Sequence, residues 1–148
     1  MGIEDIMPWE LCLKEHIKSI EPDIEKARAL LKMASLRHEF WSSIKFDKKY
    51  TSIAVDGYYE VIKELLTALL YIEGYKSDNH ECLISFLKKR YPKMEYEIGI
   101  IYQLKGIRNS IGYRGTIVRN EYLEHNKLEF EHIIKTLQNI IKEKLKEG

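Results

Sequence analysis

The sequence predicts an all-α protein, an up-and-down helical bundle of five or six helices. Apolar residues recur every three or four positions in several long segments, and no segment of useful length alternates apolar and polar residues as a strand does. Proline and glycine fall between these segments, where helices begin and end. Because 148 residues fit one globular domain, we expect a single domain over 1–148, with a peripheral helix in 1–20 and the bundle core in 21–148.

Two long helices are predicted in the first half of the bundle, and a shorter amphipathic helix, Glu4 to Ser19, is expected to pack across the outside. Pro22 suits a first helical turn and opens the first long helix, whose apolar stripe is Ile24, Ala27, Leu31, Ala34, His38 and Trp41. After a polar break at 46–49, Thr51 or Ser52 is expected to cap the second, which Gly74 ends. Its stripe is Ala54, Tyr58, Val61, Leu65, Ala68 and Ile72.

Three more helices complete the predicted bundle. A short helix carries Leu83, Ile84 and Leu87 and stops at Pro92. The next runs from about Glu95 to Ile111, where Gly112 and Gly115 allow the chain to leave the helix. The last runs from about Asn120 to Lys146, with charges alternating on its outer face and the apolar residues Phe130, Ile133, Leu137, Ile140 and Ile141 on the other.

The composition excludes several classes of protein. Lys+Arg 24 against Asp+Glu 23 gives a net charge of +1, so the chain lacks the basic surface of a general nucleic-acid binder and any RNA contact must be local. Cys12 and Cys82 lack metal-ligand spacing, and we interpret both as small core residues in a reducing cytoplasm. Acidic residues near the N-terminus and the lack of a long apolar run predict a cytoplasmic protein without a signal peptide or membrane segment. No metal or other cofactor is predicted.

The stretch Arg108-Asn109-Ser110-Ile111-Gly112-Tyr113-Arg114-Gly115 gathers two guanidiniums, an amide, a phenol and two glycines at a predicted helix end. Helical spacing places Arg108 at the edge of an apolar stripe, where a guanidinium needs a partner. One interpretation is a phosphate site, because guanidinium grips phosphate with two parallel hydrogen bonds. The other, which periodicity alone favours, is a structural ion pair between Arg108 and a carboxylate, with the glycines ending the helix.

A second polar group lies on the second long helix, where polar residues recur every three or four positions opposite the apolar stripe: Asp56, Tyr59, Glu60, Lys63 and Thr67. Asp56 would orient Arg108 through a two-pronged ion pair if the two helices are neighbours. Asp56 and Tyr59 fit a groove wall and a solvated face equally well. For Lys63 we favour an ordinary surface pair with Glu60 or Glu64.

These features together resemble the HEPN superfamily, in which a Tyr-Tyr pair, an Ala-Leu-Leu segment and a short helix led by His precede an Arg-x4-6-His element. The matching residues are Tyr58-Tyr59, Ala68-Leu69-Leu70, His80 and Arg108-Asn109. The resemblance covers roughly Ile24 to Gly115 and the closing helix. Tyr113 occupies the position of the motif His, and there the chain departs from the ribonuclease pattern.

The resemblance implies a metal-independent ribonuclease chemistry in which Arg steadies the charged phosphate and His moves a proton. Tyr, with a reference pKa of about 10, is a poor base at neutral pH, although it can donate a hydrogen bond or stack on a nucleobase. On an unbroken helix Arg108 and Tyr113 point about 140° apart, so their cooperation requires a bend at Gly112. The tentative catalytic set is therefore Arg108, Asn109 and Tyr113, and the binding set adds Arg114, Asp56, Tyr59 and Lys63.

Other residues carry weaker signals. Arg119 and His125 also match an Arg-x5-His spacing, but lie about 120° apart on a charged helix, beyond the place where the motif ends. His38 falls on an apolar stripe, His80 suits a helix start, and His16 and His132 suggest no partner. The rings of Tyr58, Tyr59, Tyr102 and Tyr113 either surround Arg108 as stacking planes or fill the core.

Three functions follow, and we rank them in this order. The first is a nucleotide- or RNA-phosphate-binding protein, the second a metal-independent ribonuclease toxin, and the third a non-catalytic helical interaction module in which Arg108 is a structural ion pair. The resemblance also implies a homodimer whose two motif regions share one groove, and a toxin–antitoxin or defence setting with a nucleotidyltransferase partner.

Overall fold

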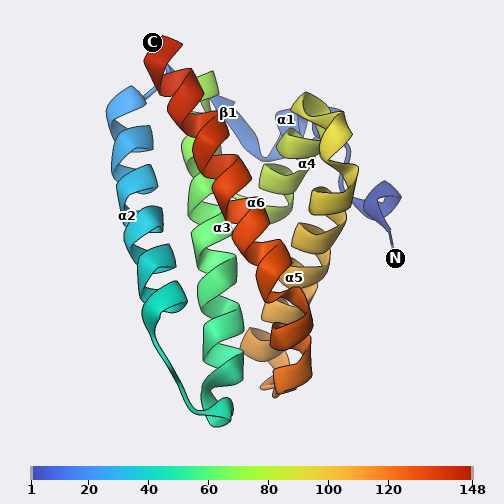
Figure 1. Cartoon of the computed structure of the whole chain (residues 1–148). Coiled ribbons are helices and arrows are strands. Elements are labelled where there is room, and N and C mark those ends of the chain that lie inside the picture. The colour runs from blue at the N-terminus through green and yellow to red at the C-terminus, as the bar shows by residue number, and fades with distance from the viewer. Residues whose placement is uncertain (1, 148) are drawn as a thin grey trace.

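The computed structural model describes residues 2–147 and confirms the predicted helical bundle (Figure 1). Short 3₁₀ turns at Ile3–Asp5, Lys48–Tyr50 and Pro92–Met94 each precede one of the longer helices. The α-helices are α1 (Trp9–Glu15), α2 (Ile24–Ser43), α3 (Thr51–Glu73), α4 (His80–Arg90), α5 (Glu95–Arg114) and α6 (Asn120–Glu147).

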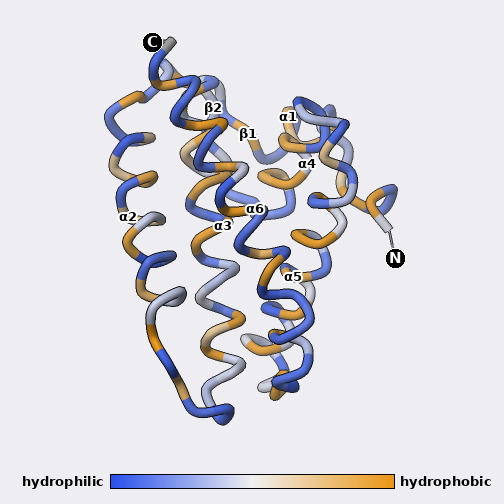
Figure 2. The backbone as a smooth tube through the Cα atoms, viewed as in Figure 1, coloured by the Kyte–Doolittle hydropathy of each residue, from blue (hydrophilic) through white to orange (hydrophobic). Residues whose placement is uncertain are grey.

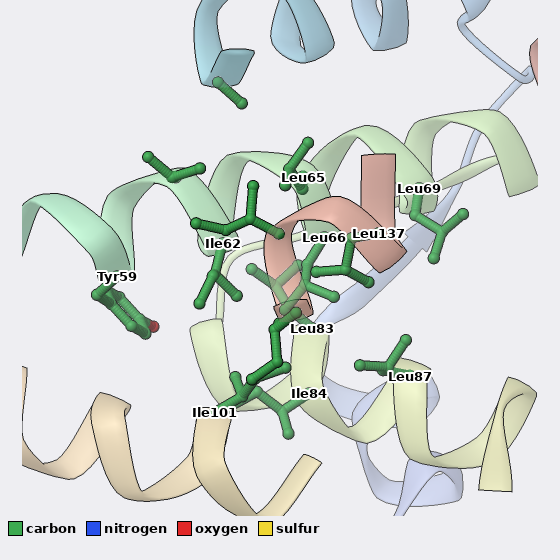
Figure 3. Packing of buried hydrophobic residues seen from close by; sticks show 14 of the residues in the cluster. Tyr59, Ile62, Leu65, Leu66, Leu69, Leu83, Ile84, Leu87, Ile101 and Leu137 are labelled. Carbon is green, nitrogen blue, oxygen red and sulfur yellow. The ribbon is translucent and has the colours of Figure 1, made fainter. Parts of the chain in front are cut away.

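Helix α3 is the centre of the molecule. It packs against α2, α6, α5 and α4, and consequently is buried around most of its circumference. Figure 3 shows the apolar contacts between α3, α4, α5 and α6 that surround Ile62, Leu66, Leu83, Ile101 and Leu137. In Figure 2 the hydropathy of the outer helices alternates along their length, as expected for helices with one face on the core. The polar line of α3 lies at the margin of this packing: Tyr59 is buried, whereas Asp56, Glu60, Lys63 and Thr67 are half-buried.

Local signals account for the helix ends. Asp23 caps α2 by accepting a hydrogen bond from the backbone nitrogen of Lys26 at 2.9 Å, and Asn79 caps α4. Gly74 ends α3 with a left-handed φ of 83°. Thr51 and Ser52 do not cap α3 as predicted. Ser52 Oγ instead accepts a hydrogen bond from the backbone nitrogen of Val118 at 2.8 Å and so holds the α5–α6 loop against the start of α3.

The predicted N-terminal helix is shorter than Glu4 to Ser19. Pro8 stands directly before α1, and the chain after Glu15 forms the strand β1 (Ile17–Ser19). This strand pairs antiparallel with β2 (Tyr75–Ser77), with Lys18 opposite Lys76. Neither strand was predicted, because three residues are too few to show an alternating pattern.

Cys12 and Cys82 are both fully buried, as predicted, but they form a disulfide that joins α1 to α4. Their Cα atoms lie 5.7 Å apart although 70 residues separate them in the sequence. The interpretation of both residues as core residues of a reducing cytoplasm did not predict this bond. Their spacing carried no signal, since pairing across the bundle depends on how α1 packs on α4.

Helix α5 continues through Gly112 and ends at Arg114, three residues later than predicted. Gly115 ends it with a left-handed φ of 65°, and its backbone nitrogen donates to the carbonyl of Ile111 at 3.2 Å. The expected bend at Gly112 is absent from the described helix. Any cooperation between Arg108 and Tyr113 must therefore occur across a regular helix.

Candidate functional site

Arg108 of α5 reaches α3 and pairs with Asp56, as predicted. Its Nε donates a hydrogen bond to Asp56 Oδ1 at 3.1 Å. The contact is single rather than two-pronged, and the next carboxylate oxygen, Glu60 Oε1, lies 3.7 Å from Nη2. Within the described chain neither terminal nitrogen of Arg108 donates a hydrogen bond. Asp56 thus orients the guanidinium through Nε and leaves its outer edge available.

Arg108 is neither buried nor fully solvated. Its side chain is 28% exposed, and that of Asp56 is 45% exposed. The guanidinium lies over the ring of Tyr59 at 5.6 Å from the ring centroid, so the ring covers one face of the guanidinium. Tyr59 itself is buried, and this burial raises the pKa of its phenol to about 12. In Figure 3 its side chain points from α3 toward α5, so it forms a neutral floor beneath Arg108.

The charges around Arg108 alternate in sign. Lys63 Nζ lies 2.9 Å from Glu60 Oε2, as we favoured, and Lys105 Nζ lies 3.8 Å from Glu81 Oε1. Together with Arg108 and Asp56 these residues give a nearly balanced cluster between α3, α4 and α5. Such a cluster favours one anionic group in a defined position over a long polyanion.

Two surface hollows meet at Arg108. The hollow on the α3 side has a volume of about 430 Å³, and besides Arg108 its walls are Ser52, Ile53, Asp56, Ile111, Gly112 and Tyr113. We call it the α3 hollow. The hollow on the α4 side has a volume of about 330 Å³, and besides Arg108 its walls are Asp78, Asn79, His80, Glu81, Lys105, Asn109 and Tyr113. We call it the α4 hollow.

The predicted residues divide into those that line the hollows and those that do not. Arg108 and Tyr113 line both, although the helix between them is unbroken, and Asn109 lines the α4 hollow. Tyr113 is 84% exposed, so its ring is available for stacking on a ligand. Arg114 is exposed at the end of α5 and lines neither hollow, and Lys63 is held by Glu60.

His80 also lines the site, although the sequence analysis named it only as a helix start and as part of the resemblance, and not as a site residue. The first residue of α4, it packs its ring against Tyr59 with 6.3 Å between centroids and lines the α4 hollow with Arg108. Burial of the ring and then the nearby charges of Lys63 and Arg108 lower the pKa of His80. The imidazole is therefore neutral at pH 7 and able to accept a proton.

Two of the four tyrosines lie elsewhere. Tyr58 packs on Phe130 of α6 with 5.6 Å between ring centroids, on the opposite side of α3 from Arg108. Tyr102 lines a separate hollow on the outer side of α5 with Gly99 and Gly106. Sequence periodicity could not show which of these tyrosines lie near Arg108, because that depends on how α5 and α6 pack around α3.

The other histidines also have defined places. His38 Nε2 lies 2.9 Å from Glu131 Oε1 and joins α2 to α6. His16 and His132, for which the sequence suggested no partner, lie beside Asp78 and Glu97. His125 and Arg119 are exposed and line neither hollow, so the competing Arg-x5-His match does not form part of this site.

The chain matches no protein-family model, no curated protein and no solved structure. Among residues 2–147 there is no group of three or more His, Cys, Asp or Glu side chains arranged to hold a metal ion. In that same range no helix has the length and apolar character needed to cross a membrane.

Proposed function

We propose that the site around Arg108 binds the phosphate of RNA or of a nucleotide, as the resemblance to HEPN proteins implies. The observation that supports this most is the placement of Arg108, which is anchored to Asp56 through Nε and lines two hollows. Its terminal nitrogens would grip the phosphate, Asn109 would add an amide, and the exposed ring of Tyr113 would stack on a base.

The test is fluorescence anisotropy with a short labelled single-stranded RNA, competed by nucleoside phosphates. We expect Arg108→Ala to weaken binding by about tenfold, since a charge-assisted pair contributes about 1.4 kcal/mol or more. Arg28→Ala removes the same charge from α2, away from both hollows, and should leave binding unchanged. Binding should weaken with salt along a shallow slope, about −0.7 per phosphate contacted. If wild-type protein binds neither RNA nor nucleotide, the proposal is wrong.

A structural role alone for Arg108 predicts a different outcome. An interaction module with a buried Arg108–Asp56 pair would lose much of its stability in Arg108→Ala, because a buried carboxylate would lose its partner. Asp56 is 45% exposed, so we expect water to replace the guanidinium and the variant to lose less than about 1 kcal/mol. A much larger loss, measured by thermal unfolding, would favour the structural role.

The second candidate is a metal-independent ribonuclease, and the position of His80 favours it. In this reaction the RNA 2′-hydroxyl attacks the adjacent phosphorus and the 5′ oxygen leaves, giving a 2′,3′-cyclic phosphate and a 5′-hydroxyl. His80 would accept the proton of the 2′-hydroxyl, Arg108 would stabilise the phosphorane charge, and the Tyr113 phenol would protonate the leaving oxygen.

Cleavage assays in EDTA separate this candidate from binding alone. Active protein should leave 2′,3′-cyclic phosphate ends, and both His80→Ala and Arg108→Ala should abolish cleavage, whereas His125→Ala, a histidine outside the site, should not. Intact RNA at high protein concentration would reject catalysis and leave the binding proposal standing.

A homodimer that brings two copies of the α5 end together would place two Arg108 and two Arg114 side chains along one groove. The exposed side chains of Tyr113 and Ile117 at this end, 84% and 82% exposed, support such an interface. A nucleotidyltransferase partner and a toxin–antitoxin setting rest on the resemblance. They are tested by co-purification with the product of an adjacent gene that carries a Gly-Ser and paired-Asp motif.

A further inference from the structure

Helix α2 carries a line of exposed apolar residues on the side that faces away from the bundle. Leu36 is 52% exposed, and Met33 and Phe40 are similarly exposed, whereas Ala27 and Ala34 on the opposite side are fully buried. Figure 1 shows α2 at the edge of the molecule, with α3 on its inner side and no element on its outer side. The line consists of Ala29, Met33, Leu36 and Phe40, and we call it the α2 stripe.

The spacing of the α2 stripe is that of a coiled-coil seam. Its members follow one another at intervals of four, three and four residues, which are the a and d positions of successive heptads. An isolated exposed apolar residue needs no explanation, but a repeated seam on an edge helix lacks the second helix that such a seam contacts.

Charged residues flank the α2 stripe and indicate what covers it. Lys32 and Glu39 stand at g positions on one side of the stripe, and within the described chain neither makes an ion pair. Arg37 stands at an e position on the other side and pairs with Glu64 of α3. The free charges are therefore one cation and one anion, seven residues apart on the same flank.

We propose that α2 pairs antiparallel with α2 of a second copy of this chain, about a two-fold axis near residues 34 and 35. In that register Met33 packs on Leu36 of the second copy, and Ala29 packs on Phe40 of the second copy, a small residue against a large one. Lys32 then lies opposite Glu39 of the second copy, and the symmetry forms this pair twice.

The parallel arrangement is disfavoured by the same charges. In a parallel pair the g position of one helix faces the following e position of the other, so Lys32 would face Arg37 of the second copy. Two such like-charged pairs would form, whereas the antiparallel arrangement forms two opposite-charged pairs. The charge pattern thus selects both the partner and its direction.

This interface is independent of the proposed phosphate site. In Figure 1 α2 and α5 lie on either side of α3, so pairing through α2 leaves both hollows at Arg108 open. An interface at the end of α5 would use Tyr113 and Ile117 instead. The two interfaces are therefore distinguished by substitutions on α2 and in the loop after α5.

The test is sedimentation velocity of the full chain over a concentration series at low salt. We expect a monomer–dimer equilibrium that Leu36→Glu weakens by at least about tenfold, since it places two carboxylates in the seam. Leu128→Glu, on α6 and 83% exposed, is the matched control and should leave the equilibrium unchanged. Circular dichroism would verify that both variants retain their helical content.

A charge exchange tests the direction of pairing. Lys32→Glu and Glu39→Lys should each weaken the dimer by about fivefold or more, because each places two like-charged pairs in the interface, and the double variant should restore it. A monomer at all concentrations, a dimer that Leu36→Glu leaves intact, or a double variant as weak as the single ones would overturn the proposal. So would a dimer lost in Ile117→Glu and kept in Leu36→Glu, which would place the interface at the end of α5.

Discussion

Two glycines show how differently the α2–α3 contact and the last turns of α5 are built. A β-carbon at Gly57 of α3 would stand 2.1 Å from Nε1 of Trp41 on α2, so the two helices touch through a position that only hydrogen fits. At Gly112 of α5, no described atom outside its own helical turns lies within 4 Å of such a carbon. The α2–α3 contact is filled, whereas the end of α5 keeps open surface beside Arg108.

The difference separates what stabilises the fold from what is available to a ligand. Near Trp41, Glu131 accepts hydrogen bonds from both His38 and Ser42 and so joins α2 to α6. At the end of α5, Arg108 donates one hydrogen bond within the described chain, from Nε to Asp56, and its Nη2 lies 3.7 Å from Glu60 Oε1. Substitutions should therefore change stability in the first region and binding in the second.

The largest effect is expected from the disulfide, which ties α1 to the helix that begins with His80. Replacing Cys12 and Cys82 together by Ser should lower the free energy of unfolding by about 2–4 kcal/mol, because the bond closes a long loop in the unfolded chain. Urea unfolding measures the change. Wild-type protein unfolded with reductant should match the double variant, and equal midpoints with and without reductant would contradict the prediction.

Gly57→Ala should lower the free energy of unfolding by about 1–3 kcal/mol, because the new methyl group overlaps the indole of Trp41 and α2 must move away from α3. Urea unfolding gives the loss, and the near-ultraviolet circular dichroism of Trp41 should change with it. A variant as stable as wild type would show that the α2–α3 contact is looser than its geometry indicates.

The same substitution at Gly112 should have the opposite sign. Ala is the better helix former, and its methyl group meets no neighbour here, so Gly112→Ala should raise the free energy of unfolding by about 0.5–1 kcal/mol. A loss of stability in Gly112→Ala would mean that the last turns of α5 are bent in solution, as we had expected for cooperation between Arg108 and Tyr113.

The long helices and the Arg108–Asp56 contact were predictable because each depends on a periodic or chemical signal within one or two segments. The periodic apolar residues predicted for α2, α3 and α6 determine which side of each helix faces the core. A guanidinium at the edge of such a row requires a nearby carboxylate. Gly115, rather than Gly112, ends α5 because only the final glycine adopts a positive φ, and two glycines three residues apart look alike in a sequence.

The features that were missed depend on contacts between distant segments. The disulfide forms only if α1 packs on α4. The β1–β2 pair forms only if the segment after α1 and the segment before α4 lie side by side in register. His80 belongs to the site only because α4 starts beside Tyr59, a contact that no local pattern carries. The missing motif His thus drew attention to position 113, while the histidine that lines a hollow with Arg108 comes from another helix.

The smallest effect concerns this histidine and the pH dependence of stability. Because the pKa of His80 is lowered in the folded protein, the unfolded chain binds a proton more readily, and protonation favours unfolding. Relative to His80→Asn, wild-type protein should therefore lose stability as the pH falls from the unfolded pKa of His80, about 6.5, to its lower folded pKa. Above about pH 6.5 the two proteins should show the same pH dependence. Arg108→Ala removes one of the charges that lower this pKa, so the loss should be smaller in that background. Urea midpoints of wild type, His80→Asn, Arg108→Ala and the double variant between pH 5 and pH 8 would measure these differences. A wild-type profile parallel to that of His80→Asn would show that Arg108 does not affect the titration of the imidazole and that the two residues do not share one site.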